Sequence, residues 1–264
     1  MIRRVALIAL GVFVFLVTLT VTVPAHQAYR LLPGHLPVEA WGVRGTLWNG
    51  GADTVIAEDV RLERLRWELD PSALWQGRLA YDLSGRIADG QFSGRVATRT
   101  GQVVEITELR ADMSADALLR LIGTAEYPAA LGGRLDAFIH HGTLDRGTPT
   151  RLQGIANWQN ADITAFGETV ALGSFGVRIE TAADGTLLGD LRNTEHGPLE
   201  INGDVQLTLD GTMTGETRVV TTEAASEELL QGMMVLGIPD PESELNIRFE
   251  GNINDPMGFR GHLE

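Results

Sequence analysis

The stretch Asn202-Gly-Asp-Val-Gln-Leu-Thr-Leu-Asp-Gly211 contains the pattern that decides the fold of this chain. Its apolar residues Val205, Leu207 and Leu209 alternate with Gln and Thr, and this period of two places them on one face of a β-strand. The flanking Asn-Gly and Asp-Gly pairs are residue types that readily adopt the positive-φ conformations that tight hairpin turns require. The stretch therefore predicts one strand of an antiparallel sheet, with a turn at each end.

The same pattern recurs through most of the chain. Apolar alternation is found in residues 65–69, 79–83 and 245–249, and further Asn-Gly or Asp-Gly pairs stand at 49–50, 89–90 and 184–185. Glycine accounts for 31 of the 264 residues, well above the roughly 7% of an ordinary chain, which favours turns and strands over long helices. We expect a mainly β fold, a curved antiparallel sheet over residues 41–264.

Two segments depart from this period and predict short amphipathic helices. Residues 114–123 begin with Ser, a good N-cap, and end at Gly. Residues 222–236 place Leu229, Met233 and Leu236 on one helical face, with acidic residues early in the segment. A shorter stretch, residues 71–77, is expected to form about one helical turn between two strands.

The N-terminus predicts a membrane span. Residues 5–23 are uncharged and mostly apolar, and as a helix they would extend roughly 28 Å, close to the hydrocarbon thickness of a bilayer. Arg3 and Arg4 precede them, which keeps that end in the cytoplasm. We therefore expect a cytoplasmic stub at 1–4, a transmembrane helix at 5–23, a linker at 24–40 and an exported β-rich domain at 41–264.

A cleavable signal peptide is the alternative interpretation of the same segment. Val23-Pro24-Ala25 offers small residues where a signal peptidase acts. The length of the apolar stretch favours a retained anchor, because signal-peptide cores usually have only about 7 to 15 residues. Both interpretations place the body of the protein outside the cytoplasm.

Composition excludes several classes of function. The chain has no Cys, and all 21 of its cationic side chains are Arg, so thiolate chemistry, a Walker lysine and a Schiff base are all unavailable. Its formal net charge of −14 would repel nucleic acid. We find no H-E-x-x-H or G-x-S-x-G motif, and we expect no catalytic residues, no metal site and no cofactor.

Four of the five tryptophans lie close together in the sequence, at Trp41, Trp48, Trp67 and Trp75. They would form either a contact surface near the membrane or the core of the N-terminal part of the sheet. We favour the core, because Trp67 falls within the apolar alternation of residues 65–69.

These tryptophans also belong to motifs with a family resemblance. The box Trp41-Gly-Val-Arg-Gly-Thr-Leu-Trp-Asn-Gly-Gly-Ala52 follows the N-terminal apolar segment, and a strand and turn follow at 65–77. With residues 197–211 and the helix that ends near 236, they resemble the type II secretion system protein N family over nearly the whole chain. Residues 238–243 depart from the turn expected there. The candidate interaction or family-motif residues are Trp41, Gly45, Thr46, Leu47, Trp48, Gly50, Trp67, Leu74 and Gly77.

The resemblance implies a non-enzymatic accessory component of the inner-membrane secretion platform. It would support export of folded periplasmic proteins across the outer membrane, with its domain in the periplasm and other secretion subunits as partners. We expect docking at sheet edges near residues 41–52 and 244–250, because edge strands can pair with a partner segment.

The alternative is an anchored periplasmic β-groove protein that binds or transfers lipid. The two hypotheses differ in one observable, since a lipid groove requires apolar side chains on the inner face that no helix or second sheet buries.

Overall fold

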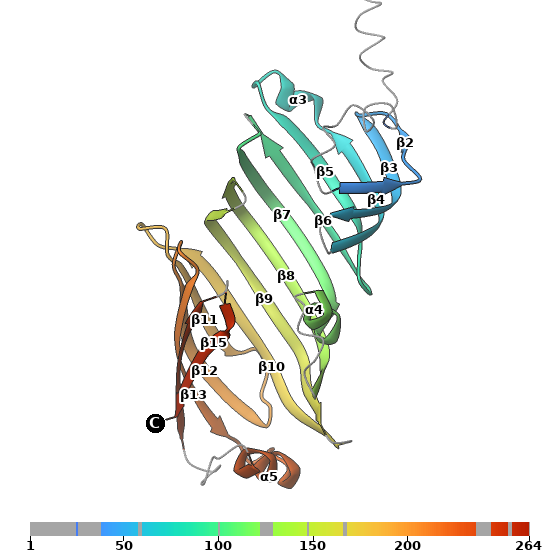
Figure 1. Ribbon diagram of the computed structural model, residues 1–264. Helices are drawn as coiled ribbons and strands as arrows, with labels where there is room; N and C mark the ends of the chain where they lie inside the picture. Colours follow the sequence, from blue (N-terminus) through green and yellow to red (C-terminus); the bar gives the residue numbers. More distant parts are fainter. Residues whose placement is uncertain are drawn as a thin grey trace, which may run out of the picture.

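The computed structural model contains one 15-stranded antiparallel sheet (Figure 1). It describes Ala25 and residues 38–57, 60–99, 101–121, 129–146, 148–165, 168–235, 244–252 and 255–263. Each strand from β3 to β14 is hydrogen-bonded to the next one along the chain, β1 pairs with β3, and β2 also pairs with β3. The sheet is thus a single meander without crossovers.

The strands are β1 (Val38–Trp41), β2 (Arg44–Gly45), β3 (Asn49–Ala57), β4 (Val60–Leu69), β5 (Leu79–Ile87), β6 (Gly90–Thr98), β7 (Val103–Ser114), β8 (Ala129–Asp145), β9 (Thr148–Ala165), β10 (Glu168–Thr181), β11 (Leu187–Asn193), β12 (Leu199–Leu207), β13 (Thr212–Thr221), β14 (Leu245–Asn252) and β15 (Asp255–Leu263). The helices are α3 (Pro71–Leu74), α4 (Ala115–Leu121) and α5 (Glu227–Val235).

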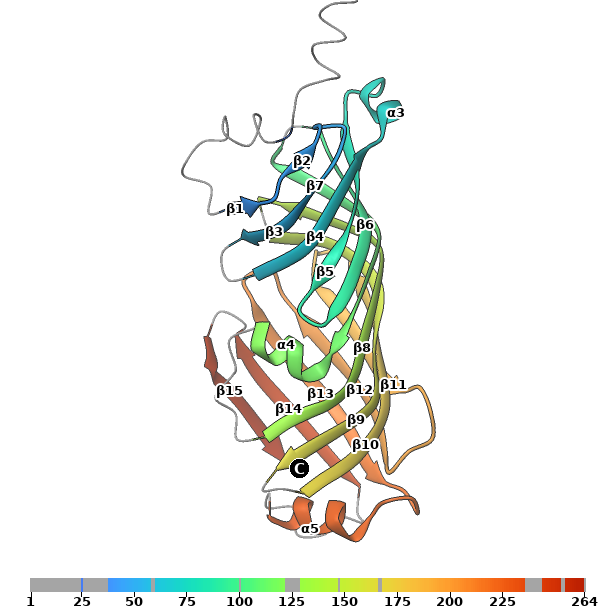
Figure 2. The same cartoon turned by 90° about the vertical axis from the view of Figure 1, so that its right-hand side faces the viewer.

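The sheet is strongly curved and stays open. In Figure 2, β1 and β3 at one end and β14 and β15 at the other both bend toward the same side. Within the described residues no pairing joins β1 to β15. The right-handed twist that accumulates across so many strands accounts for this coiled shape. The expectation of a mainly β, curved antiparallel sheet is confirmed.

The two faces of the sheet have opposite character. Cross-strand pairs such as Ile201 with Val219, and Val219 with Leu245, place apolar side chains on one face. The residues that alternate with these along each strand, such as Arg218 and its cross-strand partner Asn202, point to the other face. We call these the apolar face and the charged face.

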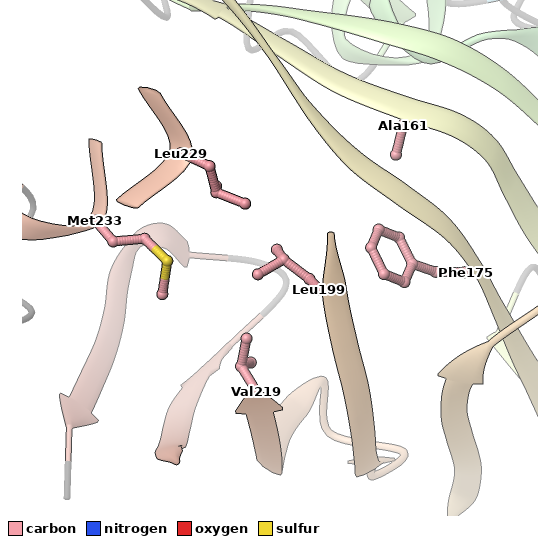
Figure 3. Close-up of a cluster of buried hydrophobic side chains, with 6 residues drawn as sticks. All are labelled: Ala161, Phe175, Leu199, Val219, Leu229 and Met233. Atoms are coloured by element: carbon pink, nitrogen blue, oxygen red, sulfur yellow. The ribbon is translucent and has the colours of Figure 1, made fainter. Parts of the chain in front are cut away.

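A compact core forms where α5 packs against the apolar face. Leu229 and Met233 of α5 meet side chains from β9, β10, β12 and β13, and these side chains converge from the surrounding strands (Figure 3). The buried members are Ala161, Phe175, Leu199, Val219, Leu229 and Met233. Because side chains of several strands converge there, the apolar face is the concave one.

The predicted helices lie close to their expected positions. The helix α4 occupies most of 114–123, and α3 occupies the start of 71–77. The segment 222–236 becomes helical only at Glu227, because Thr222 first accepts a turn hydrogen bond from the amide of Ala225. Ser226 then caps α5 with its hydroxyl, which accepts from the amide of Leu229 at 3.2 Å.

The predicted transmembrane segment, with Arg3, Arg4 and the cleavage site near Ala25, falls almost entirely outside the described residues. Among the helices that the structure describes, none combines the length and the apolar character of a membrane span. The strand β1 begins at Val38, within the range expected to be a linker.

Two expectations about turns and edges are wrong. Asn202 and Gly203 lie inside β12 rather than in a turn. Glycine is needed at 203 for close packing, since a Cβ there would lie 2.6 Å from the hydroxyl oxygen of Thr217. The segment 244–250 is not a sheet edge, because β14 lies between β13 and β15. The terminal strands are β1, with the short β2 beside it, and β15.

Candidate functional site

The N-terminal motif forms a tight turn between β2 and β3. The hydroxyl of Thr46 accepts hydrogen bonds from the amides of Trp48 and Asn49, both at 3.2 Å. The amide of Thr46 donates to the carbonyl of Asn49 at 2.9 Å. The hydroxyl and backbone of Thr46 therefore close the turn that returns the chain into β3.

Two glycines of the motif are required by this turn. Gly45 has a φ of +80°, a conformation that side chains other than Gly rarely adopt. Gly50 faces Trp67 across the β3–β4 pair, and a Cβ on Gly50 would lie 2.6 Å from the indole. The Trp67 indole N–H donates to the carbonyl of Thr46 at 3.0 Å. Gly45, Thr46, Gly50 and Trp67 thus form one packed unit, here called the turn box.

The remaining motif residues are divided between this region and α3. Trp48 is half-buried, and its carbonyl accepts from the amide of Leu69 at 2.7 Å. Trp41 and Leu47 stay exposed, at 49% and 38%. Leu74 lies in α3, and Gly77 follows it.

The tryptophans do not form one common core. Trp67 and Trp48 are half-buried, whereas Trp41 is exposed and Trp75 is 93% exposed at the end of α3. Figure 1 shows α3 at the same end of the sheet as β2 and β3. The N-terminal end of the sheet therefore presents aromatic side chains to the surroundings.

Local contacts hold α3 in place. Asp70 is its N-cap, and the carboxylate accepts from the hydroxyl and the amide of Ser72 at 2.6 and 2.9 Å. These hydrogen bonds lower the pKa of Asp70, and the Arg95 guanidinium at 3.5 Å adds to the effect. Beneath the helix, Ala73 packs with Ala80 and Ala97. This support fixes the position of the exposed Trp75.

The apolar face is only partly covered. Away from α5, most of its large side chains are half-buried, although Leu69 and Leu187 are buried, and among the described residues no large side chain is completely buried. The half-buried side chains include Leu65, Trp67, Tyr81, Leu83, Val96, Ile106, Leu109, Leu135, Ile139, Val177, Ile179, Leu191, Val205 and Phe249. The face is therefore a candidate surface for an apolar ligand.

The charged face carries a feature that the sequence analysis missed. Arg64, Arg66, Arg86 and Arg110 line one depression of about 690 Å³ over β4 to β8. The sequence contains only a weak signal for it, because these arginines are far apart in the chain and the pairing register is needed to bring them together. Within the described residues, no group of three or more His, Asp or Glu side chains is placed to hold a metal ion.

Comparisons with known proteins give the family context. Residues 37–248 match the sequence profile of the family described as type II secretion system (T2SS), protein N. The chain is similar to type II secretion system protein N of Aeromonas hydrophila, with 26% identity over 95% of this chain and 99% of that protein. It is also similar to the Vibrio cholerae serotype O1 protein of the same name, with 35% identity over 33% of this chain and 35% of that protein. No solved structure matches the chain.

Proposed function

The chain belongs to the type II secretion system protein N family, and from this premise we propose that it is a non-enzymatic accessory subunit of the inner-membrane secretion platform. In this role it would be anchored by residues 5–23, with the sheet in the periplasm. It would hold other secretion subunits in place while folded proteins are exported across the outer membrane.

The observation that carries this proposal is the exposed end of the sheet at β1 and β2. β1 is a terminal strand of the sheet, and Trp41 and Leu47 leave large apolar surfaces in solvent beside it. A terminal strand with neighbouring apolar side chains suits an extended partner segment, which would add backbone hydrogen bonds and bury both side chains. The partner we expect is an extended segment of another secretion subunit.

The exposed aromatic group supports an orientation relative to the membrane. Residues 24–37 separate the expected span from Val38, so β1 would lie within about 50 Å of the membrane surface, the reach of that many extended residues. Figures 1 and 2 place α3 at the same end of the molecule as β2 and β3. Trp75, at 93% exposure, and Leu74 would then reach the interfacial layer, where amphipathic indole rings are favoured.

Site-specific photocrosslinking tests the docking surface. A photoreactive phenylalanine replaces Trp41 in the full chain, expressed in cells that assemble the secretion system. The matched control replaces Ile155 of the central strand β9, which is also exposed, at 40%. Crosslinks to secretion subunits from position 41 but not from position 155 support the proposal. Equal crosslinking from both positions, or none from position 41 in secreting cells, contradicts it.

Membrane fractionation tests the anchor separately. A full-length protein that resists carbonate extraction supports the retained span. A soluble protein whose intact mass corresponds to a start near His26 contradicts the anchored subunit.

A second candidate function is lipid binding on the apolar face. The observation that favours it is the long row of half-buried apolar side chains that α5 covers only at one end. Acyl chains would complete the burial of this surface. In this function the sheet would carry lipid along its concave side.

Lipidomic mass spectrometry of the purified full chain tests the second function. The variant Val177→Asn/Leu191→Asn makes a cross-strand pair on the apolar face polar. The control Ile155→Asn/Leu188→Asn changes two exposed apolar residues of the charged face. Lipid that copurifies with the wild type and the control, but is reduced in the first variant, supports lipid binding. An equal lipid content in all three proteins contradicts it.

A further inference from the structure

Four arginines on the charged face lack an acidic partner. Within the described residues, the guanidinium groups of Arg64, Arg66 and Arg86 make no ion pair or hydrogen bond, and that of Arg110 lies over the ring of Phe138 at 4.9 Å from its centroid. This is unexpected in a chain with 35 acidic and 21 basic residues. Most other arginines near carboxylates are paired, as Arg95 is with Asp82 at 2.8 Å.

The pairing register places the arginines around two serines, Ser84 and Ser93, which form the floor of the depression. Arg66 pairs with Ser84, Ser84 pairs with Ser93, and Ser93 pairs with Arg110. The two arginines are thus three strands apart, roughly 14 Å at the usual strand spacing. Two short serine side chains lie between them, so the long guanidinium arms stand on both sides of a depression of about 690 Å³.

Two irregular strand positions accompany the cluster. Arg64 has a φ of +51° in the middle of β4, and the β4–β5 register shifts between Glu63 and Arg66. Such a bulge re-aims a side chain, and here Arg64 and Arg66 line the same depression. Glu108, two residues before Arg110, also has a φ of +51°. Non-glycine residues in this conformation carry a conformational cost that functional sites often retain.

The two carboxylates that line the depression have other partners. Asp112 pairs with Arg134 at 2.8 Å. Asp136 accepts hydrogen bonds from the side-chain amides of Asn157 and Gln159, at 2.9 and 2.7 Å. The lining of the depression thus holds four guanidinium groups against two carboxylates, Asp112 and Asp136, and its formal charge is positive.

The cross-strand neighbour of Arg86 is also engaged elsewhere. This neighbour is Glu63, and it lies 3.4 Å from Arg61. Arg86 is only half exposed, and a half-buried cation without a partner is unfavourable unless a ligand neutralises it.

We propose that this depression binds a phosphate-bearing anion, with Arg66 and Arg110 holding it from opposite sides and Ser84 and Ser93 beneath it. Guanidinium groups bind phosphate oxygens in bidentate, charge-assisted pairs, and serine hydroxyls donate to the same oxygens. The floor is only two strands wide, which suits a compact anion better than an extended acidic peptide. The phosphate would come from a free anion or from a phospholipid headgroup.

Calorimetric titration of the full chain in a neutral detergent tests this site. The probes are inorganic phosphate, dihexanoyl phosphatidylglycerol and a hexaglutamate peptide. The test variant is Arg66→Gln/Arg110→Gln, and the control is Arg151→Gln/Arg178→Gln, which removes two charges from β9 and β10. Thermal melts verify that both variants fold, and Arg86→Gln serves as a second test of the same depression.

The expected result is saturable binding of a phosphate probe that weakens about tenfold or more in the test variant and is unchanged in the control. Tighter binding of phosphatidylglycerol than of phosphate assigns the anion to a lipid headgroup, and the reverse order assigns it to a free phosphate. The proposal is overturned if neither phosphate probe binds, if the test variant binds as the wild type does, or if hexaglutamate alone binds.

Discussion

The indole of Trp67 lies directly over Gly50, its cross-strand partner, and also donates a hydrogen bond to the carbonyl of Thr46 at 3.0 Å. This contact is possible only because residue 50 has no side chain. A Cβ there would lie 2.6 Å from the Trp67 ring and 2.7 Å from the carbonyl oxygen of Arg44. The contact joins the first turn of the sheet to β4.

We therefore expect Gly50→Ala to destabilise the N-terminal end of the sheet. The added methyl group must displace the indole or the β2 backbone, at a cost of about 1–3 kcal/mol. Thermal unfolding followed by circular dichroism gives the measurement. The control is Gly142→Ala in β8, whose Cβ would meet neighbours at 3.4 Å or more. Equal melting temperatures for the two variants would refute the steric explanation.

Truncation of the α5 contact should loosen the opposite end of the molecule. Leu229 is 5% exposed in the cluster with Leu199 and Val219, so Leu229→Ala should cost about 2–4 kcal/mol. Met234→Ala in the same helix is the control, because Met234 is 50% exposed and its loss should change stability by less than about 0.5 kcal/mol. Denaturant unfolding gives the free energy of unfolding of each variant. A comparable loss in both variants would mean that α5 does not pack as described.

Stability should fall in acid through carboxylates that receive hydrogen bonds, such as Asp89. The backbone amide of Ser114 donates to Asp89 at 3.1 Å, and this hydrogen bond lowers the pKa of Asp89 below 3.8, its ordinary value. The folded state then binds the proton less readily than the unfolded state. The stabilising contribution is therefore complete above the unfolded pKa and is lost as the pH falls through the folded pKa.

Melting temperatures of the wild type and of an Asp89 variant, measured between pH 7 and pH 3, test this contribution to stability. Asp89→Asn should lower stability at pH 7 by less than about 1 kcal/mol, because the site is largely exposed, and should flatten the acid dependence. Asp145→Asn, at the end of β8, is the surface control. A variant at position 89 that remains as acid-sensitive as the wild type would assign the acid loss to other groups.

The proposed membrane orientation predicts a distinct environment for residue 75. Because the chain has no Cys, Trp75→Cys and Met234→Cys each introduce a unique site for a nitroxide label. Both positions are exposed, one beside α3 and the other in α5. In the full chain reconstituted into bilayers, oxygen should relax the label at position 75 more strongly than a water-soluble nickel chelate does. The order should reverse at position 234, and identical profiles at the two sites would exclude the orientation.

Local patterns predicted much of this fold. Alternation at 65–69, 79–83 and 245–249 falls in strands, and Asp-Gly at 184–185 and 210–211 lies in turns. The Asn202-Gly203 pair failed as a turn signal because glycine also serves where a neighbouring strand approaches closely. In the structure Thr217 takes that space. Sequence alone does not distinguish these two uses of glycine.

The candidate sites were less accessible to sequence reasoning. The motif at 41–52 was found because its members are adjacent in the chain, and the structure brings Trp67 to it. The arginine depression depends on the pairing of Arg66 with Ser84 and of Ser93 with Arg110, which no local pattern encodes. The prediction of a sheet edge at 244–250 was wrong because it too depended on strand pairing. The additional strand β15 pairs with β14 and ends the sheet in its place.

The meander has a consequence for how the chain reaches its native state. Every strand from β3 to β14 pairs with its immediate successor, and most of these steps close only a short loop, the connections that contain α4 and α5 being the longer ones. Folds with such local contacts form rapidly for their size. A chain that emerges with its N-terminus first can therefore add strands in the order of synthesis. Among the described strands none has to wait for a distant partner, and each new strand covers the edge left by the strand before it.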